Sequence, residues 1–159
     1  MNVITLALRK GGAGKSTLTA HLAACAWSNG YRCLLLDADP QGSLTLSHSQ
    51  RADRGPALQS GARGIERALA FAAPAKREDR EAPVLMQSRE ALDREGVPVW
   101  SGQISQRATF SLSLAAGASV CEAAPDSAAA AEICALWSAV VRSVDVVNAA
   151  HAVARIRAA

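Results

Sequence analysis

The sequence predicts an α/β fold in which a mostly parallel sheet is flanked by helices. Residues 2–8 form a short apolar run of β-favouring residues, and the run 32–37 is continuously apolar over 33–36, which is typical of strands buried in a parallel sheet. A helical pattern over 16–29 lies between them, and glycines at 11–14 join the first run to that helix. This order of strand, loop, helix and strand is a βαβ unit, for which a right-handed crossover is expected.

The composition indicates one folded domain. The chain has 159 residues, 50% of them hydrophobic and 19% charged, which excludes a disordered chain. Its net charge of +3 permits weak contact with nucleic acid but does not argue for it. No run approaches the roughly 20 apolar residues of a membrane span, and no signal peptide is visible, so a cytoplasmic protein is expected. We expect a single domain over 1–142, irregular and shortened over 47–82, and a helical tail over 143–159.

The middle of the chain is less regular. Residues 47–64 are polar and show neither the helical nor the strand period. Beyond them we expect a helix over 64–73, a solvated charged run over 76–81 and a short strand over 83–87. A second helix should follow over 88–95 and another short strand over 97–100.

The last third is predicted to be helical. One helix should run from Ser105 to Ala116 and end at Gly117. A second should start near Asp126, a good N-cap residue, and continue into or fray along the tail from Asp145. Its apolar stripe should face the core, with Trp137 as a packing residue: Ile133, Leu136, Trp137, Val140, Val141 and Val144.

The four cysteines carry no metal-binding or redox motif. Cys25, Cys33, Cys121 and Cys134 contain no C-x-x-C pair and no ligand-like spacing. We therefore interpret them as reduced thiols in the core of a cytosolic protein.

The strongest motif is the loop RKGGAGKST over 9–17. A loop between a buried strand and a helix N-terminus directs several backbone N–H groups to one point, where the helix dipole also attracts an anion. The sequence therefore predicts a phosphate site in which Lys15 contacts the terminal phosphates and Ser16 binds Mg²⁺. The expected nucleotide-binding residues are Lys10, Gly11, Gly12, Ala13, Gly14, Lys15, Ser16 and Thr17.

A second motif, LLLDADPQGS, follows the second apolar run. Asp37 and Asp39 stand just past the carboxyl end of that predicted strand, where α/β sheets bind ligands. An ordinary Asx-Pro turn is the alternative interpretation of Asp-Ala-Asp-Pro taken alone.

The string KGGAGKST resembles the deviant Walker A motif of the ParA/MinD family of P-loop ATPases. The resemblance implies a P-loop NTPase-like fold, ATP and Mg²⁺ as cofactors, and a homodimer that encloses two ATP molecules. Lys15 would serve the chain's own nucleotide and Lys10 that of its partner.

The DADPQGS segment is similar to the family's D-x-D-P-Q-[GA]-S. The resemblance implies that Asp39 orients or deprotonates the attacking water and that Asp37 acts through the Mg²⁺ shell. The implied catalytic set is Lys10, Lys15 and Asp39, and the implied metal set is Ser16, Asp37 and Asp39.

The stretch 97–136 is similar to the end of small ParA-like proteins, through Gln106, Arg107, Phe110, Gly117 and Glu122. The family's central strand ending in D-[TS]-P-P has no counterpart, nor has its adenine-reading asparagine, for which Gln87 is the nearest substitute. The chain therefore reads as a relative shortened in the middle, with fewer strands than the full family fold.

The resemblance implies an ATP-dependent dimerising ATPase, converting ATP and water to ADP and phosphate, in plasmid, chromosome or other cargo partitioning. The resemblance also implies two partners, a ParB-like adaptor and non-specific DNA, and no contact with a membrane. The expected location is the cytoplasm, possible association with the nucleoid included. The alternative is a hydrolysis-deficient nucleotide-binding module or a remnant of a partition ATPase.

Overall fold

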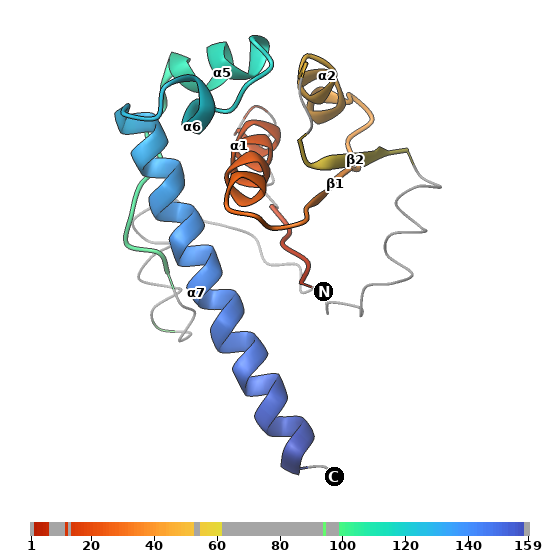
Figure 1. Cartoon of the computed structure of the whole chain (residues 1–159), viewed down its shortest axis with the longest axis vertical. Helices are drawn as coiled ribbons and strands as arrows, with labels where there is room; N and C mark the ends of the chain where they lie inside the picture. The colour runs from red at the N-terminus through yellow and green to blue at the C-terminus, as the bar shows by residue number, and fades with distance from the viewer. Residues whose placement is uncertain are drawn as a thin grey trace.

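The computed structural model describes residues 2–6, 12, 14–52, 55–61, 94 and 99–157, with side chains described up to 153. Its helices and strands, in chain order, are α1 (Lys15–Ser28), β1 (Leu34–Asp37), α2 (Ser43–Ser49), β2 (Ala57–Ser60), α5 (Ala108–Ala115), α6 (Val120–Ala123) and α7 (Ala128–Arg157) (Figure 1).

Helix α1 confirms the predicted helix over 16–29 to within one residue at each end. It ends in a Schellman motif: the Gly30 amide donates to the Trp27 carbonyl at 2.9 Å and the Tyr31 amide to the Ala26 carbonyl at 3.1 Å. Gly30 has a φ of 83°, which a residue with a Cβ adopts only with strain. The predicted stop at Gly30 is therefore correct.

Strands β1 and β2 form a parallel pair in the register Leu34↔Ala57 to Asp37↔Ser60. β1 confirms the predicted strand over 32–37 in a shorter form. α2 makes the crossover between the two strands, so β1, α2 and β2 form a βαβ unit (Figure 1).

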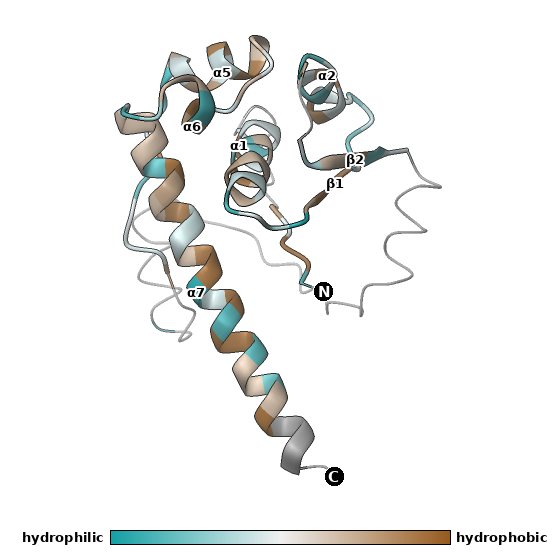
Figure 2. Cartoon of the chain, in the orientation of Figure 1, coloured by the Kyte–Doolittle hydropathy of each residue, from teal (hydrophilic) through white to brown (hydrophobic). Residues whose placement is uncertain are grey.

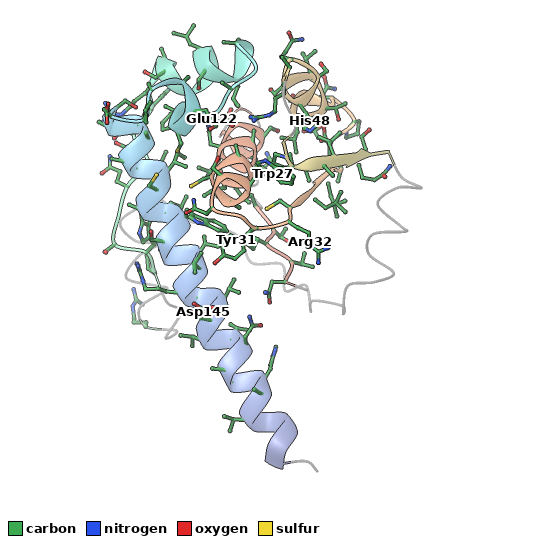
Figure 3. All side chains as sticks on the ribbon, viewed as in Figure 1. Trp27, Tyr31, Arg32, His48, Glu122 and Asp145 are labelled. Carbon is green, nitrogen blue, oxygen red and sulfur yellow. The ribbon has the colours of Figure 1, made fainter. Side chains whose placement is uncertain are left out.

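Neither α2 nor β2 was expected, because 47–64 shows no period. α2 buries only Leu44, and no side chain of β2 is fully buried, so neither element carries an apolar pattern. Both are fixed by tertiary bonds instead: the His48 ring bonds the Pro56 carbonyl at 2.8 Å, and β2 pairs with β1. Figure 3 shows His48 between these two elements.

The predicted first strand is wrong over its described part. Residues 2–6 are extended without strand pairing, and Val3 and Ile4 are 56% and 50% exposed. Their apolar character suits a strand (Figure 2), but within the described residues β1 pairs with β2 alone. Without a neighbouring ladder an apolar run does not become a strand.

The predicted strand over 97–100 is likewise not formed at its two described residues, Val99 and Trp100. Of the helix expected over 88–95 only Arg94 is described, and it is helical. The expectations over 64–73, 76–81 and 83–87 lie outside the described residues.

Helix α5 starts three residues later than the predicted Ser105. The segment before it is held extended by Glu132 of α7, whose carboxylate accepts from the Ser105 amide at 2.9 Å, the Ser105 hydroxyl at 2.9 Å and the Arg107 guanidinium at 2.9 Å. At the other end, the predicted stop at Gly117 is correct, and Gly117 has a φ of 75°.

Helix α6 was not predicted, although its signature is in the sequence. Ser119 and Glu122 form a capping box: the Ser119 hydroxyl accepts from the Glu122 amide at 3.3 Å, and the Glu122 carboxylate accepts from the Ser119 amide at 2.6 Å. α7 is capped by Ser127, whose hydroxyl accepts from the Ala130 amide at 3.1 Å. The predicted cap, Asp126, is therefore wrong by one residue.

The main core lies among α1, α5, α6 and α7. Its buried members are Leu22, Cys25, Phe110, Val120, Ala129, Ala130 and Ile133. The predicted stripe of α7 faces it or lies half-buried beside it, which confirms that prediction. Trp137 packs edge-on against Tyr31, with ring centroids 5.3 Å apart, so it is a packing residue as expected.

The C-terminal half of α7 extends away from the other described elements (Figure 1). The tail predicted to continue or fray is therefore helical to Arg157, with Val146 and Val147 exposed. No helix in the described part of the chain is both long enough and apolar enough to span a membrane.

Candidate nucleotide-binding site

The N-terminus of α1 carries the described part of the glycine loop. The first helical bond runs from the Leu18 amide to the Gly14 carbonyl at 2.8 Å. By helix geometry the amides of Lys15, Ser16 and Thr17 then have no partner within the helix. The N-cap residue, Gly14, has no side chain with which to cap them, and the first turn of α1 holds no acidic residue. The positive end of the α1 dipole therefore faces the glycine loop without a carboxylate in that turn, which favours an anion.

Two glycines shape the approach to these amides. Gly12 and Gly14 have φ values of 71° and 79°, in the left-handed region where a side chain is strained. An added Cβ would meet nothing within 4 Å at either position. Glycine is thus required here by the backbone turn, and no atom of the described residues fills the place that a Cβ would take, which is compatible with close approach of a phosphate group.

Asp37 ends β1 and is 5% exposed. Its carboxylate accepts from the Asp39 amide at 3.2 Å, the Thr45 amide at 2.8 Å and the Thr45 hydroxyl at 2.7 Å. These bonds satisfy a free amide of the first turn of α2 and use three of about four acceptor positions of the carboxylate. Asp37 therefore joins the end of β1 to the start of α2.

Asp39 lies two residues further on and is exposed. Its Oδ1 accepts from the Gln41 amide at 3.0 Å, which is the Asx turn that the sequence offered as an alternative. The turn holds the carboxylate at the carboxyl end of the parallel strands, so the two interpretations of this segment are compatible.

A shallow, open depression of about 480 Å³ lies at this end of the strand pair. It brings together the two predicted aspartates with residues that the sequence did not single out. It is lined by Asp37, Asp39, Pro40, Gly42, Thr45, Leu46, Ser49, Ser60 and Gly61. The structure therefore brings Asp37 and Asp39 together in this depression. The described residues of the glycine loop, Gly12 and 14–17, are not among the residues that line it.

Three predicted site residues, Lys10, Gly11 and Ala13, lie outside the described residues. Thr45, Ser60 and Gly61 are the residues that the sequence missed. Thr45 belongs to α2, Ser60 ends β2 and Gly61 follows it, and neither element has a periodic signature. A hydroxyl eight residues after an aspartate is no motif by itself, so only the fold reveals the bond between Asp37 and Thr45.

The body of α1 is locked to the C-terminal helices by His21, which is fully buried. Its Nδ1 accepts from the Val120 amide at 3.0 Å, so its Nε2 carries the proton and donates to the Phe110 carbonyl at 3.1 Å. Burial lowers the pKa of His21, against smaller opposing effects of the Phe110 bond and of Glu122. The ring is therefore held neutral.

Glu122 extends this connection to the βαβ unit. Its carboxylate accepts two bonds from the Arg51 guanidinium, at 2.7 and 3.0 Å, and closes the capping box of α6. The Arg51 bond, together with the Ser119 bonds, lowers the pKa of Glu122 to about 2 despite partial burial. Glu122, which Figure 3 labels, is the glutamate singled out by resemblance, and it joins α6 to Arg51, two residues after the end of α2.

The chain is similar over part of its length to several known proteins, among them the following three. The chromosome-partitioning ATPase Soj of Thermus thermophilus is 50% identical over 52 residues, which are 33% of this chain and 21% of that protein. An uncharacterized ATP-binding protein of Methanocaldococcus jannaschii is 48% identical over 48 residues, 30% of this chain and 18% of that protein. The sporulation initiation inhibitor protein Soj of Bacillus subtilis is 46% identical over 43 residues, 27% of this chain and 17% of that protein.

The matches thus span about a fifth of the length of these relatives. No solved structure matches the chain significantly. The family model of the CobQ/CobB/MinD/ParA nucleotide-binding domain, in contrast, matches residues 4–120. That range holds the glycine loop, the N-terminal end of α1, both aspartates and the start of α6. The chain therefore belongs to the CobQ/CobB/MinD/ParA family of nucleotide-binding domains, with the α/β fold of few strands that its sequence predicts.

Proposed function

We propose that this chain binds ATP with Mg²⁺ at the N-terminus of α1 and hydrolyses it as a ParA-like ATPase. The observation that carries the proposal is the pair of left-handed glycines, Gly12 and Gly14, directly before a helix that starts at Lys15 and has no acidic residue in its first turn. Two of the matched relatives are named as ATPase or ATP-binding proteins, and their similarity to this chain supports ATP as the nucleotide.

The roles follow the chemistry of the residues. The amides of Lys15, Ser16 and Thr17 would hold the phosphates, together with Gly11, Gly12, Ala13 and Gly14 of the loop. The Lys15 ammonium would neutralise the β- and γ-phosphates, and the Ser16 hydroxyl would ligate Mg²⁺, which supplies charge neutralisation when bound.

The two aspartates would act differently. The exposed carboxylate of Asp39 would orient or deprotonate the attacking water, or bear on Mg²⁺. Asp37 has most of its acceptor positions filled by Asp39 and Thr45, so we assign it to the outer shell of the metal. Lys10 would act across a homodimer, where a cation brought in by the partner stabilises charge in the transition state.

The wider role is partitioning of a plasmid, a chromosome or other cargo, as the name of the Thermus thermophilus relative suggests. A ParB-like adaptor and non-specific DNA are the proposed partners, in the cytoplasm or at the nucleoid. We assign the nucleotide-binding domain to 1–142 and a helical extension to 143–159; α7 runs unbroken across that boundary.

Thermal unfolding and phosphate release with ATP·Mg²⁺ test the proposal together. ATP at about a hundredfold excess over its Kd stabilises the folded chain by about 2.7 kcal/mol, which is a rise in Tm of roughly 5–10 °C at this size. Lys15→Ala should remove most of that rise. Lys10→Ala and Asp39→Ala should keep it while losing phosphate release by about a hundredfold or more.

Lys76→Ala is the matched control, because it removes the one lysine outside the glycine loop and should change neither readout. A rise in Tm without phosphate release in the parent chain would support the alternative, a hydrolysis-deficient nucleotide-binding module. Absence of both, in a chain that is folded by circular dichroism, would refute the proposed site.

A further inference from the structure

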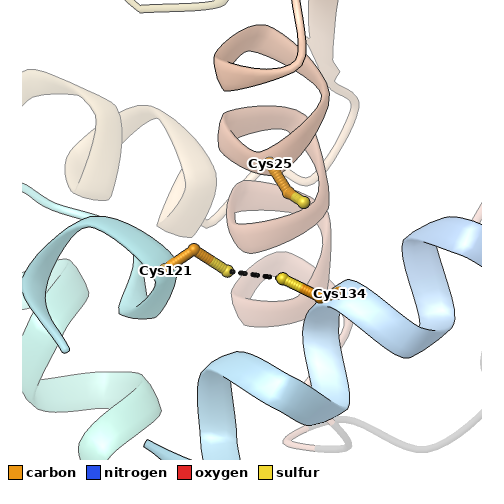
Figure 4. A group of neighbouring side chains, drawn as sticks. All are labelled: Cys25, Cys121 and Cys134. Atoms are coloured by element: carbon orange, nitrogen blue, oxygen red, sulfur yellow. Dashed lines mark hydrogen bonds between the residues drawn. The ribbon is translucent and has the colours of Figure 1, made fainter. Parts of the chain in front are cut away.

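Three of the four cysteines meet at one point, although they are far apart in the sequence. Cys25 comes from α1, Cys121 from α6 and Cys134 from α7 (Figure 4). Their three sulfur atoms all lie within 4.8 Å of one another, and the Sγ atoms of Cys121 and Cys134 are 3.9 Å apart. All three are free thiols.

The spacing is close to that of thiolates around a metal ion. In a tetrahedral zinc site the Zn–S bonds are about 2.3 Å, so the sulfur atoms lie roughly 3.8 Å apart. The Cys121–Cys134 pair already has this separation, and the third sulfur needs a shift of less than an ångström or so. We propose that Cys25, Cys121 and Cys134 form a three-thiolate site for a thiophilic divalent metal ion of the Zn²⁺ type.

The three cysteines of the cluster differ in their exposure to solvent. Cys25 is 3% exposed, Cys121 is half-buried and Cys134 is exposed. A metal ion can therefore enter from the Cys134 side, and its fourth position faces solvent or an incoming ligand. Three protein ligands with one open position is the arrangement of a zinc site that exchanges ligands, whereas structural zinc sites use four protein ligands.

The surroundings of the sulfurs agree with this assignment. The Asn29 side-chain amide donates to the Cys25 carbonyl at 2.8 Å and lies 3.8 Å from the Cys25 sulfur, where it can donate to a thiolate. Such outer partners orient metal ligands and stabilise their charge. The Cys121 thiol donates to the Ala130 carbonyl at 3.9 Å in the metal-free chain, and this proton is one that a bound metal ion would displace.

In the metal-free chain the thiols of Cys25 and Cys121 hold their protons at neutral pH. Burial, and then the proximity of Cys134, raise the pKa of Cys25 to about 11 and that of Cys121 to about 12. A metal ion must displace these protons, so its binding should release protons and tighten as the pH rises. The site would also cross-link α1, α6 and α7 across the main core.

The test uses the reduced, metal-stripped full chain without nucleotide, titrated with Zn²⁺ and, as a spectroscopic probe, with Co²⁺. We expect one ion per chain, a thiolate-to-cobalt charge-transfer band, release of protons and a higher Tm. Cys134→Ser should weaken binding by at least tenfold and diminish the band. Cys33→Ser is the matched control and should bind as the parent does, because Cys33 is outside the cluster.

Cys134 is exposed, so Cys134→Ser should fold; circular dichroism checks this, and Cys121→Ser provides a second variant. Equal binding by the parent and both variants would overturn the proposal, because His48, His151 or carboxylates would then hold the ion. The proposal would also be overturned if the reduced parent chain took up no metal ion. This holds even if Cys121 and Cys134 form a disulfide when the chain is exposed to air.

Discussion

At the scale of single residues, one buried histidine decides how α1 is held. His21 accepts a bond from Val120 and donates one to Phe110, and both groups are buried with it. The imidazole can do both only when it is neutral with its proton on Nε2, because the charged ring has no acceptor. The position of α1, and of the glycine loop at its start, therefore depends on a residue that must not take up a proton.

This predicts that the free energy of unfolding falls in mild acid. The unfolded chain binds a proton at His21 below about pH 6.5, whereas the folded chain resists it because burial lowers the pKa of His21. Unfolding then gains a proton, so stability present above about pH 6.5 is lost as the pH falls from there through the lowered pKa. Chemical denaturation between pH 7.5 and pH 5 measures this loss.

His21→Leu should lower stability at pH 7.5 by about 2–4 kcal/mol, since it leaves the Val120 amide without its partner, and should flatten the pH dependence. His151→Leu, at an exposed position on α7, should keep both the stability and the slope of the parent. Equal slopes for His21→Leu and the parent would mean that another group causes the acid sensitivity.

At the scale of elements, two helices end in the same way but in different surroundings. α1 ends at Gly30 and α5 at Gly117, each with a positive φ and a Schellman motif. Around Gly30 an added Cβ would meet nothing within 4 Å. At Gly117 it would overlap the carbonyl oxygen of Gln50, because the turn between α5 and α6 is pressed against the end of α2.

We therefore expect Gly30→Ala to cost about 1 kcal/mol, the strain of a left-handed alanine. Gly117→Ala should cost about 3 kcal/mol or more, because the backbone of Gln50 must also move. Urea denaturation of the two variants measures the difference. If both lost the same amount, the close approach of α2 to the α5–α6 turn would be excluded.

At the scale of the whole molecule, the helices rather than the sheet hold most of the buried core. Ile133 of α7 is 0% exposed and packs in the main core with residues of α1, α5 and α6. Val146, on the extended half of the same helix, is 69% exposed. α7 thus has a packed half and a half that contributes little to the fold of the described chain.

Ile133→Ala should lower the free energy of unfolding by about 2–5 kcal/mol through lost burial and a new cavity. Val146→Ala, which removes apolar volume from the same helix, should stay within about 0.5 kcal/mol of the parent. Thermal and chemical unfolding of both variants tests this. A large loss in Val146→Ala would show that the extended half of α7 is buried in solution, for instance against a second copy.

Part of the fold followed from local sequence. The Gly-rich loop, the helix it starts, the apolar run of β1 and the glycine stops at Gly30 and Gly117 depend on short-range preferences that one sequence displays. The S-x-x-E of Ser119 and Glu122 is of the same kind and could have predicted α6. Asp37 and Asp39 were predicted as a pair because both lie at the carboxyl end of the same strand.

The sequence by itself determined α1 with its stop at Gly30, the strand β1 and the helical C-terminal third, because glycine placement and apolar period act within a few residues. Only the tertiary structure decided that the apolar segment 2–6 stays unpaired in the described part, that polar residues form β2, and that Cys25 meets Cys121 and Cys134. Strand pairing and side-chain clusters join residues distant in the chain, and neither local preference nor periodicity records which distant segments become neighbours.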